Sequence, residues 1–351
     1  MLNFLQPKFV NGVSGDPAVY GFCPKSGDAL LFDLGSLKKL PAKMRLKVKT
    51  VLVSHTHVDH FIGFDELLRV NIPHRRTVDI VGPANITQNV FGKLSGYTWN
   101  LLEPGQITFR VTEYTDDQKV RVSVLKNENQ FRPIIESEQK SADSALIHML
   151  TTTDGLSVQG IPLDHGCVSM AYKVTAPTGF PVNLENVLAL GLKPGPWIRT
   201  LQAACSKGES PEFIDVDGHP YTFRDLSQQV LGTPVSESVA YITDVVFSLS
   251  ACEALRRGFV NPTLLICESS YSEEDRSRAF KKKHLTAKQA ALFAASCGAN
   301  ELRCFHVSRI YAGREEEILQ EAGTHFHHFR TLPWPTIREH IIEETRLQQK
   351  S

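Results

Sequence analysis

Short runs of apolar residues, separated by turn-forming residues, dominate the first half of this chain. Runs of this length, bounded by Gly, Pro, Asn or Asp, are typical of β-strands. One segment differs, because its apolar positions recur at helical spacing. We therefore predict a helix at 61–72 among strands at 18–23, 29–34, 50–54, 77–81, 106–114, 120–125, 145–151, 156–162 and 169–175.

Strands and helices alternate more regularly in the second half. Strands are predicted at 238–243, 263–267 and 302–306, each followed by a helix, at 247–258, 286–297 and 313–322. Strands in both halves with helices between them indicate sheets covered by helices, a layered fold of the α/β class. The chain contains no linker, repeat or low-complexity segment, so we expect residues 1–351 to form a single domain with insertions.

The composition is that of an ordinary globular protein, and its charges balance. Hydrophobic residues make up 42% and charged residues 22% of the chain. Lys plus Arg and Asp plus Glu both number 38, so no overall field attracts a polyanion, and a nucleic-acid partner would have to use local patches. Basic residues do gather at Lys38–Lys49, Arg75–Arg76 and Lys281–Lys283. For each patch taken alone, a solvated surface is the simpler interpretation.

The sequence gives no sign of export or membrane insertion. The N-terminus lacks a basic stretch followed by an apolar run, and no apolar run approaches the roughly 18 to 20 residues that span a bilayer. Seven cysteines without a Cys-x-x-Cys pair are typical of scattered reduced thiols. We therefore expect a cytoplasmic protein without a membrane partner.

Four potential metal ligands follow the predicted strand 50–54 within a few residues: His55, His57, Asp59 and His60. Side chains two apart on an extended chain project to the same side, so the first two histidines can bind one ion. The turn that follows presents the other two ligands towards a second ion. A mixed set of imidazoles and carboxylates suits zinc, with manganese or iron as alternatives. A lone histidine at a strand end is usually structural, but four ligands at this spacing predict a metal site.

Three further potential ligands stand at the ends of other apolar stretches: His165, Asp244 and His306. Polar residues commonly terminate strands, so a structural role explains each of them equally well when it is taken alone. Together they complete a coordination set for two divalent ions. An aspartate between two ions can bridge them and lower their repulsion, and Asp244 is our candidate for that role.

The order and spacing of these residues resemble the metallo-β-lactamase superfamily, whose signature is His-x-His-x-Asp-His followed by a later His, Asp and His at strand ends. The match extends over nearly the whole chain. The resemblance implies a four-layer αβ/βα sandwich with the metals at one edge of its two sheets. It also implies one ion bound by His55, His57 and His165, a second bound by Asp59, His60 and His306, and Asp244 as the bridge.

The C-terminal third is similar to one branch of that superfamily, ribonuclease Z, the endonuclease that trims the 3′ trailer of precursor tRNA. The similarity lies in Glu268–Tyr271, His284–Ala291 and Phe305–Ser308. In addition, Leu190–Pro196 resembles the Gly-Pro segment beside the tRNA-binding arm of that family. By this resemblance the partner is RNA, namely a precursor tRNA, and the protein is a homodimer.

Cleavage of a phosphodiester requires an activated water, stabilisation of charge and a proton for the departing oxygen. Two metals lower the pKa of a bridging water, which Asp59 could orient or deprotonate. The resemblance implies that His284 acts near the leaving group, where it could donate the proton, and that it pairs with Glu268. That carboxylate would hold the imidazole in one tautomer and favour its charged form. Without the resemblance, His284 is better explained as an N-terminal residue of the helix that starts near Thr286.

The leading hypothesis is therefore a metal-dependent phosphodiesterase of the ribonuclease Z type. One alternative is a relative with the same dinuclear centre and a small phosphodiester, cyclic-nucleotide or sulfate-ester substrate. Another is a catalytically silent relative that binds RNA or protein, which we would expect to carry a broken ligand set. A genuine β-lactamase is disfavoured, because those relatives work in the periplasm and this chain shows no export signal.

Two C-terminal features remain. The cluster His325–His328 could suggest another metal site, but no carboxylate pattern accompanies it, so we predict a partly exposed strand or turn. Residues 337–350 predict a polar terminal helix that could lie at a subunit contact.

Overall fold

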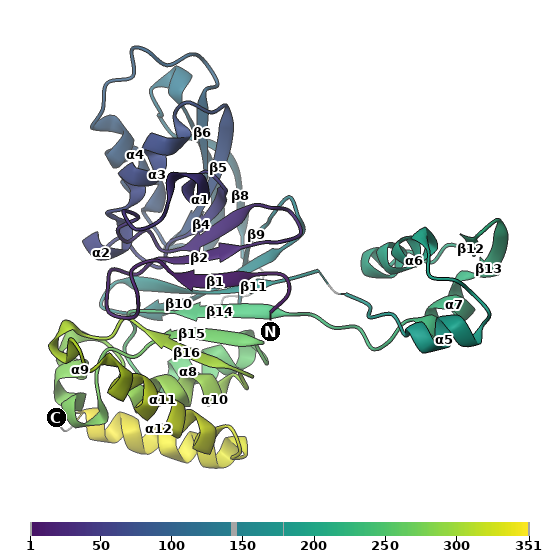
Figure 1. The fold of residues 1–351 in the computed structure, drawn as a ribbon. Helices are drawn as coiled ribbons and strands as arrows, with labels where there is room; N and C mark the ends of the chain where they lie inside the picture. The colour runs from purple at the N-terminus through teal and green to yellow at the C-terminus, as the bar shows by residue number, and fades with distance from the viewer. Residues whose placement is uncertain (1, 142–145, 178, 350–351) are drawn as a thin grey trace. The chain divides into compact units, whose positions relative to one another are not determined.

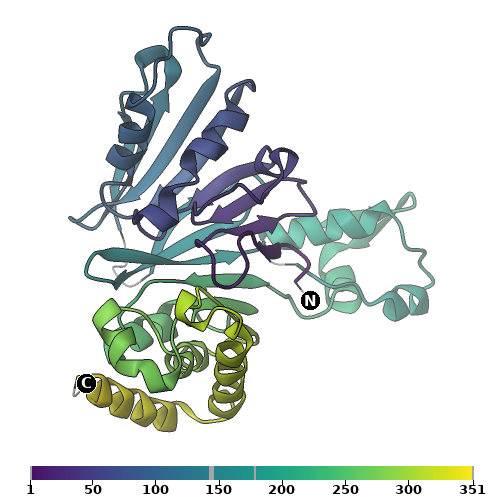
Figure 2. The same cartoon turned by 60° about the vertical axis from the view of Figure 1, so that its left-hand side comes forward.

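Two β-sheets face each other in the larger part of the chain, as the computed structural model shows (Figures 1 and 2). The structure describes residues 2–141, 146–177 and 179–349. The chain separates into two compact units, a larger one formed by Met1–Val174 with Ser238–Ser351 and a smaller one formed by Thr175–Glu237. The smaller unit is thus inserted into the sequence of the larger one.

The first sheet contains eight strands, hydrogen-bonded to one another in chain order. Strands β3 to β6 run parallel, and antiparallel strands flank them on both sides. Ala29–Phe32 is buried throughout, which is why it reads as an unbroken apolar block. The strands are β1 (Gln6–Phe9), β2 (Val19–Phe22), β3 (Ala29–Phe32), β4 (Val48–Leu52), β5 (Arg76–Gly82), β6 (Ile107–Tyr114), β7 (Lys119–Lys126) and β8 (Ile134–Lys140).

Helices α3 (Phe64–Asn71) and α4 (Ile86–Ser95) cover one face of this sheet, and their buried side chains share a core cluster with it. The shorter helices α1 (Ala42–Arg45) and α2 (Val58–Phe61) lie in the same half of the chain. The helix predicted over 61–72 corresponds mainly to α3, but its first residue belongs to α2, and a break at Gly63 separates the two helices. A side chain at this glycine would collide with the carbonyl oxygen of Gly35.

The second sheet contains six strands in the order β16-β15-β14-β11-β10-β9. Strands β14, β15 and β16 are parallel, whereas β9 and β10 are antiparallel. The predicted strand 145–151 begins at a residue outside the described ranges, and its remainder corresponds to β9. The strands are β9 (Ile147–Thr151), β10 (Ser157–Asp164), β11 (Val168–Thr175), β14 (Ser238–Ile242), β15 (Leu264–Glu268) and β16 (Leu302–Phe305).

Four helices form one hydrophobic cluster with the second sheet: α8 (Leu249–Gly258), α10 (Ala287–Ser296), α11 (Glu315–Phe329) and α12 (Trp334–Gln349). The central one, α10, is buried along nearly its whole length and packs against the other three (Figure 1). A short helix, α9 (Arg276–Lys282), precedes it. The expected strand or turn at 325–328 is wrong, because these residues continue α11. Buried Ile318, Ala322, Phe326 and Phe329 form one apolar stripe at helical spacing.

The two sheets meet through aromatic side chains. The rings of Phe32 in β3 and Tyr241 in β14 stack with centroids 5.0 Å apart. The hydroxyl of Tyr172 in β11 donates to the carbonyl oxygen of Val53 at 2.7 Å. The larger unit therefore has four layers, in the order helices, sheet, sheet, helices, and the predicted ligands follow the carboxyl ends of β4, β10, β14 and β16.

The smaller unit has a hydrophobic cluster of its own, which includes Trp197, Leu201 and Phe223. Its longest helix, α6, begins with Pro196 and is followed by the C-cap residue Gly208, whose φ is 71°. Proline is favoured in the first turn of a helix, and glycine is favoured after its end because it tolerates a left-handed conformation. Its elements are α5 (Leu184–Ala189), α6 (Pro196–Lys207), β12 (Phe213–Val216), β13 (His219–Thr222) and α7 (Phe223–Val230).

The predicted terminal helix 337–350 corresponds to α12, which begins at Trp334, and residue 350 lies outside the described ranges.

Among the helices that the structure describes, none has both the length and the apolar character needed to cross a membrane.

Candidate metal centre

The first four predicted ligands lie where the chain changes from strand β4 to helix α2. The backbone is still extended at His57, which is the N-cap of α2 with φ −60° and ψ 155°. Asp59 and His60 belong to the first turn of that helix. The ring of His60 is buried, and its centroid lies 4.2 Å from the ring of His55. The change of backbone conformation thus brings all four side chains towards one region.

The other three predicted ligands come from the carboxyl ends of β10, β14 and β16. His165 follows Asp164 at the end of β10, and it is buried. Asp244 and His306 both have a positive φ, of 47° and 57° respectively. Such left-handed backbone is uncommon outside glycine and is concentrated at functional sites. Here it turns both side chains at the strand ends towards the edge where the sheets meet.

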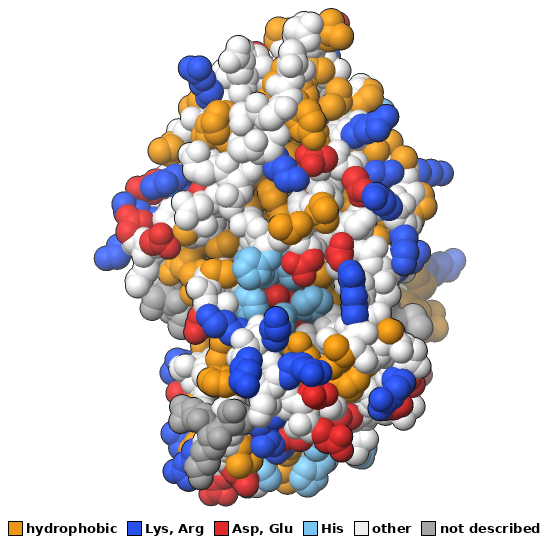
Figure 3. Space-filling view, turned by 90° about the vertical axis from the view of Figure 1, so that its left-hand side faces the viewer, with side chains coloured by type: hydrophobic (Ala, Val, Ile, Leu, Met, Phe, Trp, Pro, Cys, Tyr) orange, Lys and Arg blue, Asp and Glu red, His pale blue; other side chains and the backbone are white. Residues whose placement is uncertain are grey.

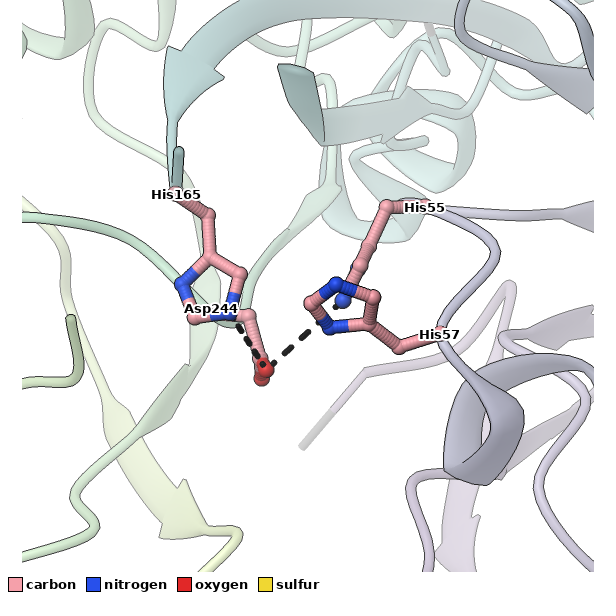
Figure 4. A group of neighbouring side chains, drawn as sticks. All are labelled: His55, His57, His165 and Asp244. Carbon is pink, nitrogen blue, oxygen red and sulfur yellow. Dashed lines mark ion pairs between the residues drawn. The ribbon is translucent and has the colours of Figure 1, made fainter. Parts of the chain in front are cut away.

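Asp244 lies between two sets of imidazoles, and Figure 4 shows it beside the first set, His55, His57 and His165. Its Oδ2 is 3.4 Å from Nε2 of His165 and 3.8 Å from Nε2 of His55. Its Oδ1 is 3.4 Å from Nε2 of His60 and 3.0 Å from Nδ1 of His306. Each carboxylate oxygen therefore faces a different pair of histidines, which is the arrangement that a bridging carboxylate needs.

The structure brings all seven predicted ligands into two groups whose ligand atoms lie within 4.8 Å of one another. The ring nitrogens Nε2 of His55, Nε2 of His60 and Nδ1 of His306 are buried and have no hydrogen-bond partner among the described residues. Buried polar atoms are nearly always satisfied, so these nitrogens fit the binding of a divalent metal. The groups are His55, His57, His165 and Asp244, and Asp59, His60 and His306.

A third group of possible ligands was not predicted as such: Asp244, Glu268, His284 and His306. Nδ1 of His284 lies 2.8 Å from Oε2 of Glu268 but 3.9 Å from Asp244. The carboxylate of Glu268 is fully buried and accepts a second hydrogen bond, from the backbone N–H of Val245 at 2.9 Å. The Glu268–His284 pair that the resemblance implied is thus present beside Asp244.

Hydrogen bonds at Nδ1, the ring nitrogen on the side away from Asp244, orient three of the histidines. Nδ1 of His60 lies 2.8 Å from Oδ2 of Asp33, and Nδ1 of His165 lies 2.8 Å from the carbonyl oxygen of Lys283. Nδ1 of His55 lies 3.0 Å from the hydroxyl of Ser54. An acceptor at Nδ1 makes that nitrogen the N–H donor and leaves Nε2 with a lone pair for a metal.

Sequence reasoning did not identify Asp33 as part of the site. Its carboxylate is fully buried and accepts hydrogen bonds from the backbone N–H of Ser54 at 2.6 Å and from the hydroxyl of Tyr241 at 2.7 Å. It follows β3 with a φ of 58°, so it turns out of a strand end as Asp244 and His306 do. A search for every acidic residue directly after a buried strand would have found it.

The charges of the centre shift its pKa values in opposite directions. Burial opposes the charged form of His60, but Asp244 and Asp33 raise its pKa to about 10. Burial and the neighbouring His60 lower the pKa of His55 to about 3. His306, whose Nε2 lies 3.8 Å from Oδ2 of Asp59, is the main cause that lowers the pKa of Asp59 to about 2. The shifts thus favour a charged imidazole at His60 and a neutral one at His55.

The Glu268–His284 pair shows matching shifts. Although burial opposes both charges, Glu268 raises the pKa of His284, and His284 lowers the pKa of Glu268 to about 2. Both shifts thus favour the charged forms, an imidazolium and a carboxylate.

A cavity of about 240 Å³ opens beside the centre and is lined in part by Asp59, His284 and His306. Figure 3 shows the histidine side chains gathered in a hollow around acidic ones, with lysine and arginine side chains at its border. One of the lysines close to the centre is Lys283, whose ammonium group packs against Gly166, next to His165. The arrangement combines a polar cavity, grouped metal ligands and nearby cationic groups.

Solved structures define the class to which this fold belongs. A metallo-β-lactamase fold protein from Bacillus subtilis matches with a TM-score of 0.51 and 16% identity, over 92% of each chain. The short form of human tRNase Z matches with a TM-score of 0.51 and 16% identity, over 87% of this chain and 94% of the other. The chain therefore has the metallo-β-lactamase fold, which confirms the predicted four-layer sandwich.

Curated relatives narrow the likeness to ribonuclease Z. The ribonuclease Z of Deinococcus radiodurans is 28% identical over 306 residues, which cover 86% of this chain and 89% of the relative. That of Methanosarcina acetivorans is 26% identical over 306 residues, which cover 85% and 84% of the two chains. No protein-family model matches the chain. The similarity to ribonuclease Z thus extends well beyond the C-terminal motifs and confirms the predicted resemblance.

Proposed function

We propose that this chain is a metal-dependent endonuclease of the ribonuclease Z type, which hydrolyses a phosphodiester near the 3′ end of a precursor tRNA. The observation that carries the proposal is the Glu268–His284 pair, 2.8 Å apart and with a buried carboxylate, beside two groups of metal ligands that Asp244 connects. Ligand groups alone fit many hydrolases. The added proton donor suits a substrate whose leaving group is a basic oxygen.

Two divalent cations would be held by the predicted ligands, one by His55, His57 and His165 and the other by Asp59, His60 and His306, with Asp244 shared between them. Bound cations of this kind lower the pKa of a shared water and neutralise charge on phosphate oxygens. The mixed imidazole and carboxylate ligands favour zinc over manganese or iron.

The residues around the cations would supply the remaining chemistry. Asp59 borders the cavity, where its carboxylate can orient the attacking water and accept its proton. His284 also borders the cavity and can donate a proton to the departing ribose oxygen. Glu268 bonds Nδ1 of His284, so the proton that is transferred comes from Nε2, and the carboxylate stabilises the imidazolium beforehand.

A second candidate is a hydrolase of the same fold that acts on a small phosphodiester, a cyclic nucleotide or a sulfate ester. One observation favours it: the inserted unit 175–237 has seven acidic and four basic residues, an unfavourable balance for binding a polyanion. The acidic residues are Glu185, Glu209, Glu212, Asp215, Asp217, Asp225 and Glu237. The basic residues are Lys193, Arg199, Lys207 and Arg224.

Three further points belong to the proposal. The inserted unit would be an elaboration of one functional domain over residues 1–351. A homodimer is supported by the resemblance to ribonuclease Z, and the location that we propose is the cytoplasm.

Salt dependence separates the two candidates. The metal-loaded protein would be assayed with a 3′-extended precursor tRNA and with bis(p-nitrophenyl) phosphate over a series of salt concentrations. If RNA is the substrate, log kcat/KM for the tRNA should fall with log salt by ~0.7 to 0.9 per phosphate contacted, while the small ester responds weakly. Efficient turnover of the small ester, with no cleavage of the tRNA at any salt concentration, would support the second candidate instead.

A further inference from the structure

A buried carboxylate in the C-terminal helix joins the two helices that flank His284. Glu344 lies in α12 and is fully buried. Its Oε1 accepts hydrogen bonds from Nε of Arg276 at 2.9 Å and from Nε2 of Gln289 at 3.2 Å. Its Oε2 lies 2.7 Å from Nζ of Lys288. The first of these partners begins α9 and the other two lie in the first turn of α10, so one carboxylate bonds to both sides of the loop 283–286.

This loop carries two groups that contact the centre. The carbonyl oxygen of Lys283 accepts the hydrogen bond from Nδ1 of His165 at 2.8 Å. The next residue, His284, places its Nδ1 2.8 Å from Glu268. A shift of the loop at its Thr286 end, which Gln289 holds, would therefore move the proposed proton donor His284.

Gln289 connects Glu344 to the loop directly. Its side-chain oxygen accepts a hydrogen bond from the backbone N–H of Thr286 at 3.0 Å, and its backbone N–H donates to the hydroxyl of Thr286 at 3.3 Å, which forms a capping box. A side-chain amide has one donating and one accepting end. Since Glu344 can only accept, it fixes the orientation in which Gln289 presents its oxygen to the loop.

The charges around Glu344 are balanced. Glu273 pairs with Arg276, lies 3.6 Å from Nζ of Lys288 and accepts a hydrogen bond from Thr286 at 3.1 Å. The network therefore contains two carboxylates and two cations. Neutralising Glu344 would leave one cation in excess in a largely buried position, and breaking a buried pair in this way usually forces a rearrangement.

We propose that Glu344 is a positioning residue, which holds α9 and α10 together and thereby keeps His284 in line with Glu268. It acts through the loop 283–286 and does not contact the cavity. The activity part of this inference rests on the proposed function, whereas its structural part does not.

The first test compares Glu344→Gln with Glu343→Gln, a matched change at the neighbouring exposed position of the same helix. With metal-loaded protein, Glu344→Gln should lower kcat for precursor tRNA by about 10- to 100-fold, part of what a general acid contributes. Hydrolysis of bis(p-nitrophenyl) phosphate should change by less than about twofold, because p-nitrophenolate leaves without a proton. Glu343→Gln should leave both rates unchanged. An equal loss on both substrates would contradict a role through His284.

A second test places Glu344→Gln in a His284→Ala background. If Glu344 acts through His284, the double variant should be no slower on tRNA than His284→Ala alone, because the two changes remove one function. Losses that multiply would overturn the proposal, since a general structural weakening acts independently of His284. Should Glu344→Gln fold poorly, Lys288→Gln removes one partner of the carboxylate and should give a smaller loss of the same selectivity.

Hydrogen exchange tests the structural part without any substrate. Peptides that cover 283–289 should exchange faster in Glu344→Gln than in the wild type, while Glu343→Gln should match the wild type. Unchanged exchange at these amides would overturn the inference even if the protein cleaves tRNA. If these amides exchange faster in Glu344→Gln but the wild type cleaves no RNA, the positioning role of Glu344 stands and the proposed function is rejected.

Discussion

Replacement of His284 by alanine tests the role of the residue most specific to the proposed chemistry. Its Nδ1 is already bonded to Glu268 at 2.8 Å, and the residue borders the cavity that also contains Asp59 and His306. Neither of the two groups that hold the seven predicted ligands requires it. We therefore expect His284→Ala to keep both cations and to lose its ability to protonate a leaving group.

The size of the effect depends on the leaving group. A positioned general acid contributes about 10²- to 10⁴-fold, or about 3 to 5 kcal/mol of transition-state stabilisation. A ribose oxygen is strongly basic and needs the whole of this contribution. For p-nitrophenolate, a weak base, the expected change is less than about threefold. Alanine is smaller than histidine, so the replacement needs no extra room. Glu268 retains its hydrogen bonds from the backbone N–H of Val245 and the hydroxyl of Ser270.

The assay measures metal content by elemental analysis and kcat on precursor tRNA and on bis(p-nitrophenyl) phosphate in the same preparation. Full metal content, a large loss on tRNA and a small loss on the aryl ester would agree with the proton-donor role. The loss of one cation would show that His284 is a ligand of the alternative group with Asp244, Glu268 and His306. A normal rate on tRNA would refute the assignment outright.

Three further predictions concern the metal ligands and their support. Asp244→Ala should lose metal and activity together, because the two carboxylate oxygens of Asp244 face histidines of both groups. Elemental analysis that found two cations retained would contradict the bridging role. Asp33→Asn should weaken metal binding about 10- to 100-fold, measured by chelator competition. It should also lower the free energy of unfolding by roughly 3 kcal/mol, because the buried hydrogen-bond donors around residue 33 would then face an amide nitrogen. An unchanged metal affinity would exclude an orienting role for Asp33. Metal binding near neutral pH should release a proton, because the pKa of His60 is raised to about 10 and the ring is protonated below that value. The apparent affinity for the metal should then fall as the pH falls. Calorimetry in buffers of different ionisation enthalpy measures the proton release, and a result of no released proton would refute this prediction.

The grouping of the proposed ligands could be predicted from the sequence because they follow local strand endings. His55 to His60 lie in one short segment, and His165, Asp244 and His306 each follow an apolar run that is in fact a buried strand. The parallel strands β14 and β16 end at the same edge of their sheet, so a pattern along the chain places Asp244 and His306 together; His165, after the antiparallel strand β10, reaches the same edge.

The missing parts depend on contacts between segments far apart in the sequence. Asp33 bonds to Tyr241 from the other sheet, and Glu344 bonds to Arg276, neither of which any local pattern indicates. The histidines at 325–328 were misassigned because the apolar stripe of α11, which ends at Phe326 and Phe329, outweighs their polar character. The unit 175–237 was not separated from the rest because its short elements carry no compositional boundary.

The most direct test of the account is to map cleavage of a 3′-extended precursor tRNA by the metal-loaded protein and by a chelator-treated control. We predict a single metal-dependent cut at the start of the 3′ trailer, restored when zinc is returned to the chelated protein. No cut in the loaded protein, or the same cut in the chelated one, would contradict the central claim.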